Sequence, residues 1–165
     1  MAKENSFDIV SETDAQEVEN AFNNAVKALK QRYDLKDSGA ELSYDKASGT
    51  LVVLAPSDFV SSQVLDILNT QLVRRKVDLK AVSWGKPEDA SGSMIRTKGT
   101  IVQGIEQEVA KRISKDVRDQ KFKVKIQIEG NKLRVSGPKR DVLQEVIAFL
   151  RDKDYGLPLQ FTNYR

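Results

Sequence analysis

Four basic residues between positions 121 and 137 have the spacing that would place them together on one face of a β-hairpin. The segment KFKVKIQIEGNKLRVSG alternates apolar and polar residues, which predicts two strands, and Gly130-Asn131 tolerates the backbone angles of a tight turn between them. One face then carries Lys123, Lys125, Lys132 and Arg134. Neighbouring cations on a sheet repel one another unless water or an anion lies against them. The chemistry that such a face offers is the binding of phosphate groups.

Two interpretations of this basic hairpin remain open from the segment alone. Its cations are either ordinary solvated charges that also prevent edge-to-edge pairing of strands, or a platform for phosphate groups. Lys139 and Arg140 follow directly, at the start of the next predicted helix, where unpaired backbone N–H groups face solvent or an anion. Positive charge at this end of a helix opposes the macrodipole, so the arrangement costs a little stability.

The sequence lacks the residues on which most enzyme mechanisms depend. It contains no histidine and no cysteine, which removes the commonest general base, the commonest metal ligand and every thiol nucleophile. It also lacks the phosphate-binding loops GxxxxGK[ST] and GxGxxG, and its carboxylates are scattered. We therefore expect a protein that is not an enzyme and that holds no metal ion or cofactor.

The 165 residues suffice for one large domain or two small ones, and their charge is unevenly distributed. Met1 to Gly92 contains 11 Lys and Arg and 15 Asp and Glu, whereas Ser93 to Arg165 contains 16 and 9, so the net charges are −4 and +7. This asymmetry suggests that only the basic half meets a polyanion. No apolar run approaches the roughly 18 residues of a membrane span, and the N-terminus lacks a signal peptide's apolar stretch. We therefore expect a cytoplasmic protein without membrane contact.

Hydrophobic periodicity predicts the same order of elements twice along the chain. A period of two marks strands near 7–11, 40–44, 50–54, 79–84, 93–98, 121–129, 132–136 and 157–161. A period near 3.6 marks helices near 13–33, 57–76, 101–117 and 139–150. The order strand, helix, strand, strand, helix, strand therefore occurs twice, with a repeat of roughly 75 to 80 residues.

This order is typical of an α+β protein with two ferredoxin-like βαββαβ units, each a four-stranded antiparallel sheet with two helices on one face. We place the first, acidic unit at 1–90 and the second, basic unit at 93–165, with Gly85–Gly92 as the linker. The basic hairpin would lie on the open face of the second sheet. The first strand, 6–11, has an alternative partner in the second sheet, since FDIV and LQFTNY at the two chain ends are similar strands. The sequence does not decide this pairing.

The predicted plan with a basic open face resembles RNA-recognition domains, but their stacking aromatic residues are missing. Those domains carry aromatics in a K/R-G-F/Y-G/A-F-V-x-F/Y strand, whereas the corresponding strand here is NKLRVSG. Phe161 and Tyr164 would fall on opposite faces of a regular last strand, so one of them would offer a stacking surface. We include Phe161 in the candidate site.

Three segments resemble the bacterial YajQ family. They are SFDIVSE near the start, SDFVSSQVLDIL in the middle, and the block from QGIEQEVAKRISKDVRDQKFKVKIQIEGNKLRVSGPKRDVLQEVI to PLQFTNYR at the end. The resemblance extends over nearly the whole chain. It implies two ferredoxin-like domains in a small cytoplasmic protein without an established catalytic site. It also implies nucleotide binding, with cyclic di-GMP as the ligand proposed in the family and RNA as an earlier suggestion.

These observations favour a non-enzymatic nucleotide-binding protein, an effector of the cyclic di-GMP type that passes a second-messenger signal to a protein or DNA partner. The alternative is an RNA-binding or protein-interaction module in which the acidic half is the partner surface. We expect a monomer that binds cyclic di-GMP or a similar nucleotide, with RNA or a regulatory protein as a further partner. The candidate nucleotide-binding residues are Lys123, Lys125, Lys132, Arg134, Lys139, Arg140 and Phe161.

Overall fold

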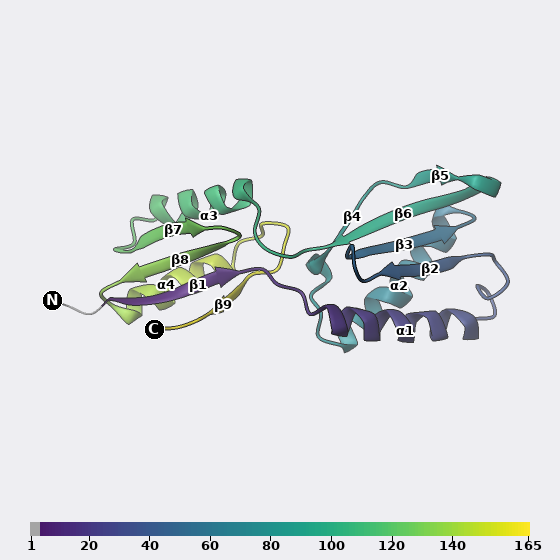
Figure 1. Ribbon diagram of the computed structural model, residues 1–165, viewed down its shortest axis with the longest axis horizontal. Helices are drawn as coiled ribbons and strands as arrows, with labels where there is room; N and C mark the ends of the chain where they lie inside the picture. Colours follow the sequence, from purple (N-terminus) through teal and green to yellow (C-terminus); the bar gives the residue numbers. More distant parts are fainter. Residues whose placement is uncertain (1–3) are drawn as a thin grey trace. The chain divides into compact units, whose positions relative to one another are not determined.

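The strands of this chain form two separate antiparallel sheets, each covered on one face by two helices (Figure 1). The computed structural model describes residues 4–165. The chain divides into two compact units, one made of Met1–Glu12 with Gln103–Arg165 and the other of Thr13–Val102. We call them the terminal unit and the inserted unit. The fold class is α+β with two ferredoxin-like repeats, as the sequence predicts.

The terminal unit contains both ends of the chain. Its strands are β1 (Asn5–Val10), β7 (Lys125–Glu129), β8 (Lys132–Gly137) and β9 (Gln160–Thr162), in the sheet order β7-β8-β1-β9. Its helices are α3 (Gln107–Asp119) and α4 (Arg140–Arg151). The core contains Phe7 and Ile9 from β1, Ile126, Leu133 and Val135 from the hairpin, and Ile113, Val117, Val146 and Leu150 from the helices. These side chains alternate with polar ones along each strand, so the helices bury one sheet face and leave the other open.

The inserted unit has its own core and a larger set of strands. They are β2 (Glu41–Asp45), β3 (Thr50–Ala55), β4 (Val82–Trp84), β5 (Glu88–Ala90) and β6 (Met94–Ile101), in the order β2-β3-β6-β4, with β5 paired to β6. Helices α1 (Ala15–Gln31) and α2 (Asp58–Arg74) pack on this sheet, and short 3₁₀ turns occupy Leu79–Ala81 and Ser91–Ser93. The core contains Leu51, Val53 and Ile101 from the strands and Val18, Ala25, Val64, Leu68 and Leu72 from the helices.

Side-chain caps fix where the two helices of the inserted unit begin. An Oδ1 atom of Asp14 accepts hydrogen bonds from the backbone N–H groups of Gln16 and Glu17, and Oγ of Ser57 accepts one from Val60. Each cap satisfies donors that the first helical turn leaves unpaired. None of the helices among residues 4–165 has the length and apolarity that crossing a membrane requires.

The two sheets have the same strand order but different threading. In the terminal unit, the chain order β1, α3, β7, β8, α4, β9 is the ferredoxin-like order, and β1 lies between β8 and β9. In the inserted unit the equivalent central position, between β3 and β4, belongs to β6, which comes last rather than first. The inserted unit is therefore the same fold with its first strand moved to its end.

This threading differs from the expected division at 1–90 and 93–165. The sequence left open which sheet contains the first strand. In the structure this strand, β1, pairs with β8 and β9 and so belongs to the second of the two predicted sheets. The strand expected to begin the second unit is β6, and it pairs with β3, β4 and β5 of the inserted unit. The expected linker Gly85–Gly92 is not a boundary, since β5 lies within it. The described residues thus form nine strands, one more than expected.

The β7–β8 hairpin confirms the predicted alternation. Glu129 pairs with Lys132 across the turn, where Gly130 has a φ of 62° that favours glycine. Ile126 lies opposite Val135, and both are buried against the helices. The polar residues between them therefore point to the open face of the terminal sheet.

Candidate functional site

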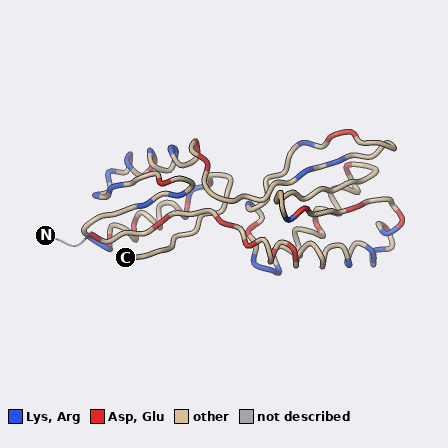
Figure 2. The backbone as a smooth tube through the Cα atoms, viewed as in Figure 1, with Lys and Arg blue, Asp and Glu red and all other residues tan. Residues whose placement is uncertain are grey.

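Three of the predicted cations lie on the open face of the terminal sheet. Lys125 belongs to β7, and Lys132 and Arg134 belong to β8, where they alternate with buried apolar residues. Figure 2 shows the basic positions of the chain in blue along the backbone of this unit. Lys125 is exposed, and the side chains of Lys132 and Arg134 are about one third exposed. We call these three residues the basic face. Gln127 lies directly opposite Arg134 on the same face and adds an exposed amide.

Asp8 lies at the centre of the basic face and binds two of its cations. Strand β1 brings Asp8 opposite Arg134, although the two residues are far apart in the sequence. Nε of Arg134 donates to Oδ1 of Asp8 over 3.0 Å, while Nζ of Lys132 and Nδ2 of Asn163 donate to Oδ2 over 3.1 and 2.9 Å. Only 2% of Asp8 is exposed. The carboxylate is thus fully partnered.

Hydrogen bonding keeps this buried carboxylate ionised. Burial alone would raise the pKa of Asp8, because water stabilises the charged form. The hydrogen bonds from Arg134, Asn163 and Lys132 outweigh that effect and lower the pKa of Asp8 to about 2. In return, the hydrogen bond to Asp8 raises the pKa of Arg134 above its usual value. Asp8 therefore fixes the orientation of two cations at any pH near neutrality.

The guanidinium of Arg134 keeps donors available beyond Asp8. Its Nε is bonded to Asp8, and its Nη1 lies 3.7 Å from Oε1 of Glu129, beyond hydrogen-bonding distance. Within residues 4–165, its Nη2 makes no hydrogen bond. Counting Lys125, Lys132 and Arg134 against Asp8 and Glu129, the face has a local excess of one positive charge. It can therefore accept a small anion, with an oriented guanidinium as the main donor.

Of the other four predicted residues, Phe161 lies on the helix-covered face of the terminal sheet, and Lys123, Lys139 and Arg140 lie outside its strands. Lys123 precedes β7 in a bend, and Lys139 is the N-cap residue of α4. Arg140 begins α4, where its Nε donates to Oδ1 of Asn5 over 3.2 Å. Phe161 lies opposite Ile9 in β9 and so on the helix-covered face. All four belong to the terminal unit, but none of them is a strand residue of the open sheet face.

The aromatic residues near the C-terminus do not separate onto two faces as expected. The ring of Phe161 lies 6.1 Å from that of Phe7, and the ring of Tyr164 lies 6.3 Å from the same ring. The reason is that Asn163 has a φ of 56°, which interrupts the strand's alternation before Tyr164. The strand is not regular at this point, so the condition for opposite faces is not met, and both rings pack with Phe7.

Several polar residues of the open faces escape prediction from the sequence. Asp8 and Asn163 join the basic face only because β1 and the C-terminal segment lie beside β8. In the inserted unit, Arg96 and Lys98 on β6 lie opposite Leu54 and Val52 and form no ion pair within the described residues. By their positions in the sequence, both cations fall in the basic half, residues 93–165. Only knowledge of the strand pairing would have identified them.

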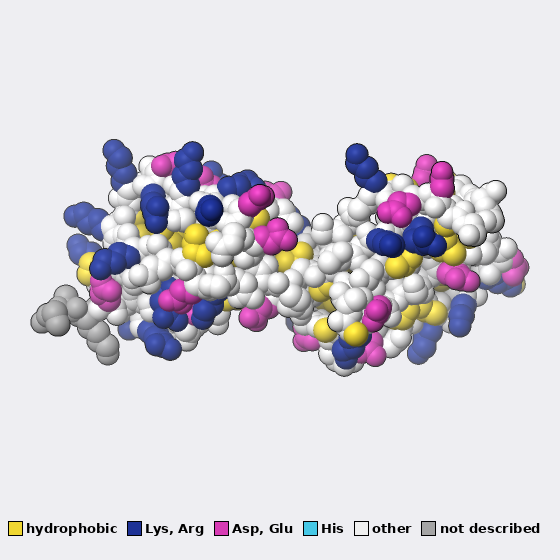
Figure 3. All heavy atoms as spheres, turned by 45° about the horizontal axis from the view of Figure 1, so that its top comes forward, with side chains coloured by type: hydrophobic (Ala, Val, Ile, Leu, Met, Phe, Trp, Pro, Cys, Tyr) yellow, Lys and Arg dark blue, Asp and Glu magenta, His cyan; other side chains and the backbone are white. Residues whose placement is uncertain are grey.

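The two units of the structure differ less in charge than the two halves of the sequence, because β1 belongs to the terminal sheet and β6 to the inserted sheet. Met1–Glu12 with Gln103–Arg165 contains 15 Lys and Arg and 12 Asp and Glu, whereas Thr13–Val102 contains 12 of each. The net charges of the units are therefore +3 and 0. In the space-filling view, basic and acidic side chains are interspersed on the visible face of the terminal unit (Figure 3). The terminal unit is therefore much less basic than residues 93–165 taken alone, which weakens the expectation that charge alone makes it bind polyanions.

Comparison with known proteins gives consistent matches over the full chain. The family described as "Nucleotide-binding protein YajQ-like" matches residues 5–165. A protein named "Nucleotide-binding protein" from Heliobacterium modesticaldum is 46% identical over 165 residues, which cover all of this chain and 99% of that protein. A protein of the same name from Chloroflexus aggregans is 47% identical over 167 residues, and the match covers all of both chains. A nucleotide-binding protein from Bdellovibrio bacteriovorus is 48% identical over 160 residues, covering 97% and 98% of the two chains.

Proposed function

Because the chain belongs to the family of YajQ-like nucleotide-binding proteins, we propose that it is a non-enzymatic protein that binds a nucleotide of the cyclic di-GMP type on its basic face. The observation that carries the proposal is the fixed geometry around Asp8. Its carboxylate holds Arg134 and Lys132 side by side on an open sheet face. Cations that are oriented before a ligand arrives lose less conformational entropy on binding.

The chemistry of a guanine nucleotide matches the groups on this face. An arginine fork can bond O6 and N7 of guanine, or two phosphate oxygens, at the same time, and it can also stack on a base. Lys125 and Lys132 supply point charges for phosphate groups, and Gln127 supplies an amide for hydrogen bonds. A ligand with two phosphates and two bases can therefore use every group on the face.

The local charge favours a small ligand over a long RNA strand. Proteins that bind single-stranded RNA without base specificity combine a strongly positive groove with stacking aromatic residues. The basic face has a local excess of one positive charge, and the nearby Phe161 lies on the other side of the sheet. We therefore place cyclic di-GMP, or a similar nucleotide, ahead of RNA.

The proposal is tested by titrating the folded protein and its variants with cyclic di-GMP in a calorimeter. Arg134→Ala should weaken binding by roughly 5- to 150-fold, the range for removing one good bidentate contact. Arg32→Ala is the matched control, because Arg32 also donates Nε to an aspartate, Asp34, but lies in the inserted unit. It should leave the affinity unchanged.

Two outcomes would contradict the proposal. Equal affinity of the parent, Arg134→Ala and a Lys125→Ala/Lys132→Ala double variant would show that the basic face does not hold the ligand. Binding of a short single-stranded RNA with a steep salt dependence, without binding of cyclic di-GMP, would favour the RNA alternative. A ligand that contacts only two phosphates should instead give a slope of log affinity against log salt no steeper than about −1.4.

A further inference from the structure

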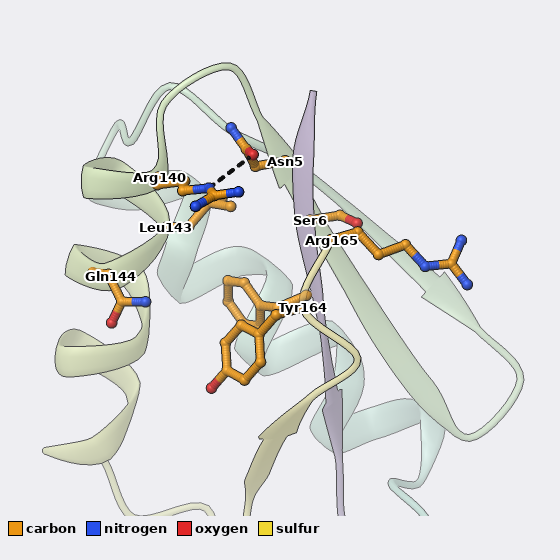
Figure 4. A pocket seen from close by; sticks show the side chains of 8 residues that line it. Asn5, Ser6, Arg140, Leu143, Gln144, Tyr164 and Arg165 are labelled. Atoms are coloured by element: carbon orange, nitrogen blue, oxygen red, sulfur yellow. Dashed lines mark hydrogen bonds between the residues drawn. The ribbon is translucent and has the colours of Figure 1, made fainter. Parts of the chain in front are cut away.

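A hollow of about 310 Å³ lies on the helix side of the terminal sheet, apart from the basic face (Figure 4). It lies between the first two turns of α4, the beginning of β1 and the segment that follows β9. Its lining residues are Asn5, Ser6, Phe7, Arg140, Leu143, Gln144, Tyr164 and Arg165. All of them belong to the terminal unit, and among the predicted site residues only Arg140 is included.

Tyr164 presents an aromatic ring to this hollow from a fixed position. The residue is 58% exposed, yet its ring packs at 6.3 Å and a tilt of 33° against the fully buried ring of Phe7. The backbone groups of Ser6 and Arg165 exchange two hydrogen bonds, of 3.1 and 2.9 Å, so the segment that carries Tyr164 extends the sheet. An exposed ring that is already ordered can stack on a flat ligand with little loss of entropy.

Two polar side chains of α4 face the same hollow. Arg140 is oriented by its hydrogen bond to Asn5, which uses Nε and leaves the terminal nitrogens for a ligand. Gln144 follows one helical turn later, and its amide points towards Tyr164 in the close view (Figure 4). The side chain of Arg165 points away from the hollow in the same view. No Asp or Glu side chain is among the lining residues.

These groups have the complementary chemistry of one nucleotide. A planar base can stack on Tyr164, and such stacking is sequence-tolerant because every base has an aromatic face. A phosphate can take the free donors of Arg140, and the amide of Gln144 can pair with N6 and N7 of adenine. A volume of about 310 Å³ is at the lower end of the roughly 300–1,000 Å³ of small-molecule sites, which suits a single nucleotide unit.

We propose that this hollow is a second binding site, which takes an adenosine monophosphate unit through Tyr164, Arg140 and Gln144. The site lies on the opposite side of the sheet from the basic face and shares no residue with it. It therefore does not depend on the function proposed for Lys125, Lys132 and Arg134. In this proposal Arg140, at the start of α4, binds the phosphate in the hollow and does not contribute to the basic face.

Nuclear magnetic resonance titrations of the full chain test this site. The probes are adenosine 5′-monophosphate, adenosine and inorganic phosphate. The monophosphate should give saturable shifts of the amide signals of Ser6, Gln144 and Arg165 and should bind at least about tenfold more tightly than either of the other probes. Tyr164→Ala should weaken its binding by roughly 5- to 150-fold, the usual range for loss of one stacking contact. Tyr164→Phe keeps the ring and should bind as the parent does.

Matched variants separate this site from non-specific binding and from the basic face. Tyr33→Ala removes an exposed tyrosine of the inserted unit, and Arg151→Gln removes another arginine of α4; neither should change the affinity. Arg140→Gln should weaken binding of the monophosphate, whereas Arg134→Ala should not. The proposal is overturned if phosphate binds as tightly as the monophosphate, if Tyr164→Ala binds like the parent, or if no saturable shift occurs at millimolar probe.

Discussion

Asp8 determines how the basic face is arranged at the scale of single residues. A buried carboxylate without partners would be strongly destabilising, but here three side-chain donors surround it. The same contacts hold Lys132 and Arg134 in place, so a residue that repels an anionic ligand also positions the groups that attract it. Removing Asp8 should therefore affect stability and binding in different ways.

The pH dependence of stability should report the environment of Asp8. Its folded pKa of about 2 is below the ordinary value of 3.8, so its contribution is fully present above about pH 5 and is lost as the pH falls towards 2. Since one pKa unit corresponds to about 1.4 kcal/mol, the contribution is about 2 kcal/mol. In denaturant melts, the free-energy difference between the parent and Asp8→Asn should shrink by about this amount between pH 6 and pH 2. A difference that stays constant over this range would show that Asp8 is not held as described.

The sequence predicts part of this arrangement and misses the rest for a physical reason. The alternation in the hairpin is local, and it is sufficient to place Lys125, Lys132 and Arg134 on one face. Asp8 and Asn163 reach the same face through hydrogen bonds that span 126 and 155 positions of the chain. No periodicity within a segment encodes such contacts. The face on which Phe161 lies is likewise not encoded within its own segment, since it follows from the pairing of β9 with β1.

At the scale of elements, the two faces of β7 should respond differently to truncation. Ile126 is buried in the core of the terminal unit, whereas its neighbour Lys125 points to the open face. Ile126→Ala should lower the free energy of unfolding by roughly 2–5 kcal/mol, the usual loss when a core site is emptied. Lys125→Ala is the matched control and should change it by less than about 0.5 kcal/mol.

Denaturant melts of the two variants test this assignment of faces. Equal losses of unfolding free energy would mean that Ile126 and Lys125 have been assigned to the wrong faces of β7. The comparison is sharp because both substitutions lie in one strand and differ by one position. It also checks that the basic face can be altered without unfolding the protein, which the binding experiments require.

At the scale of the whole molecule, the main difference from the sequence-based expectation is threading. Both β1 and β6 alternate apolar and polar residues, and each is followed by a helix along the chain. Periodicity therefore predicts the four helices, eight of the nine strands among the described residues and the fold class, but it cannot choose between exchanged strand partners. Because β1 carries Asp8 while β6 carries Arg96 and Lys98, the choice also decides the charge of each unit.

Isolated fragments should distinguish the two divisions of the chain. A fragment of residues 13–102 contains every strand of the inserted sheet, so it should fold and unfold cooperatively on heating. A fragment of residues 1–90 lacks β6, the strand between β3 and β4, and should not form this sheet. Circular dichroism melts would contradict the threading if the fragment 1–90 unfolded cooperatively and the fragment 13–102 did not.

The most direct test of the central claim is a nuclear magnetic resonance titration of the full chain with cyclic di-GMP. If the nucleotide binds on the basic face, the amide signals of Asp8, Lys125, Lys132 and Arg134 should shift in a saturable way, and those of residues 13–102 should stay in place. Saturable shifts confined to residues 13–102, or no shifts at all, would contradict the account.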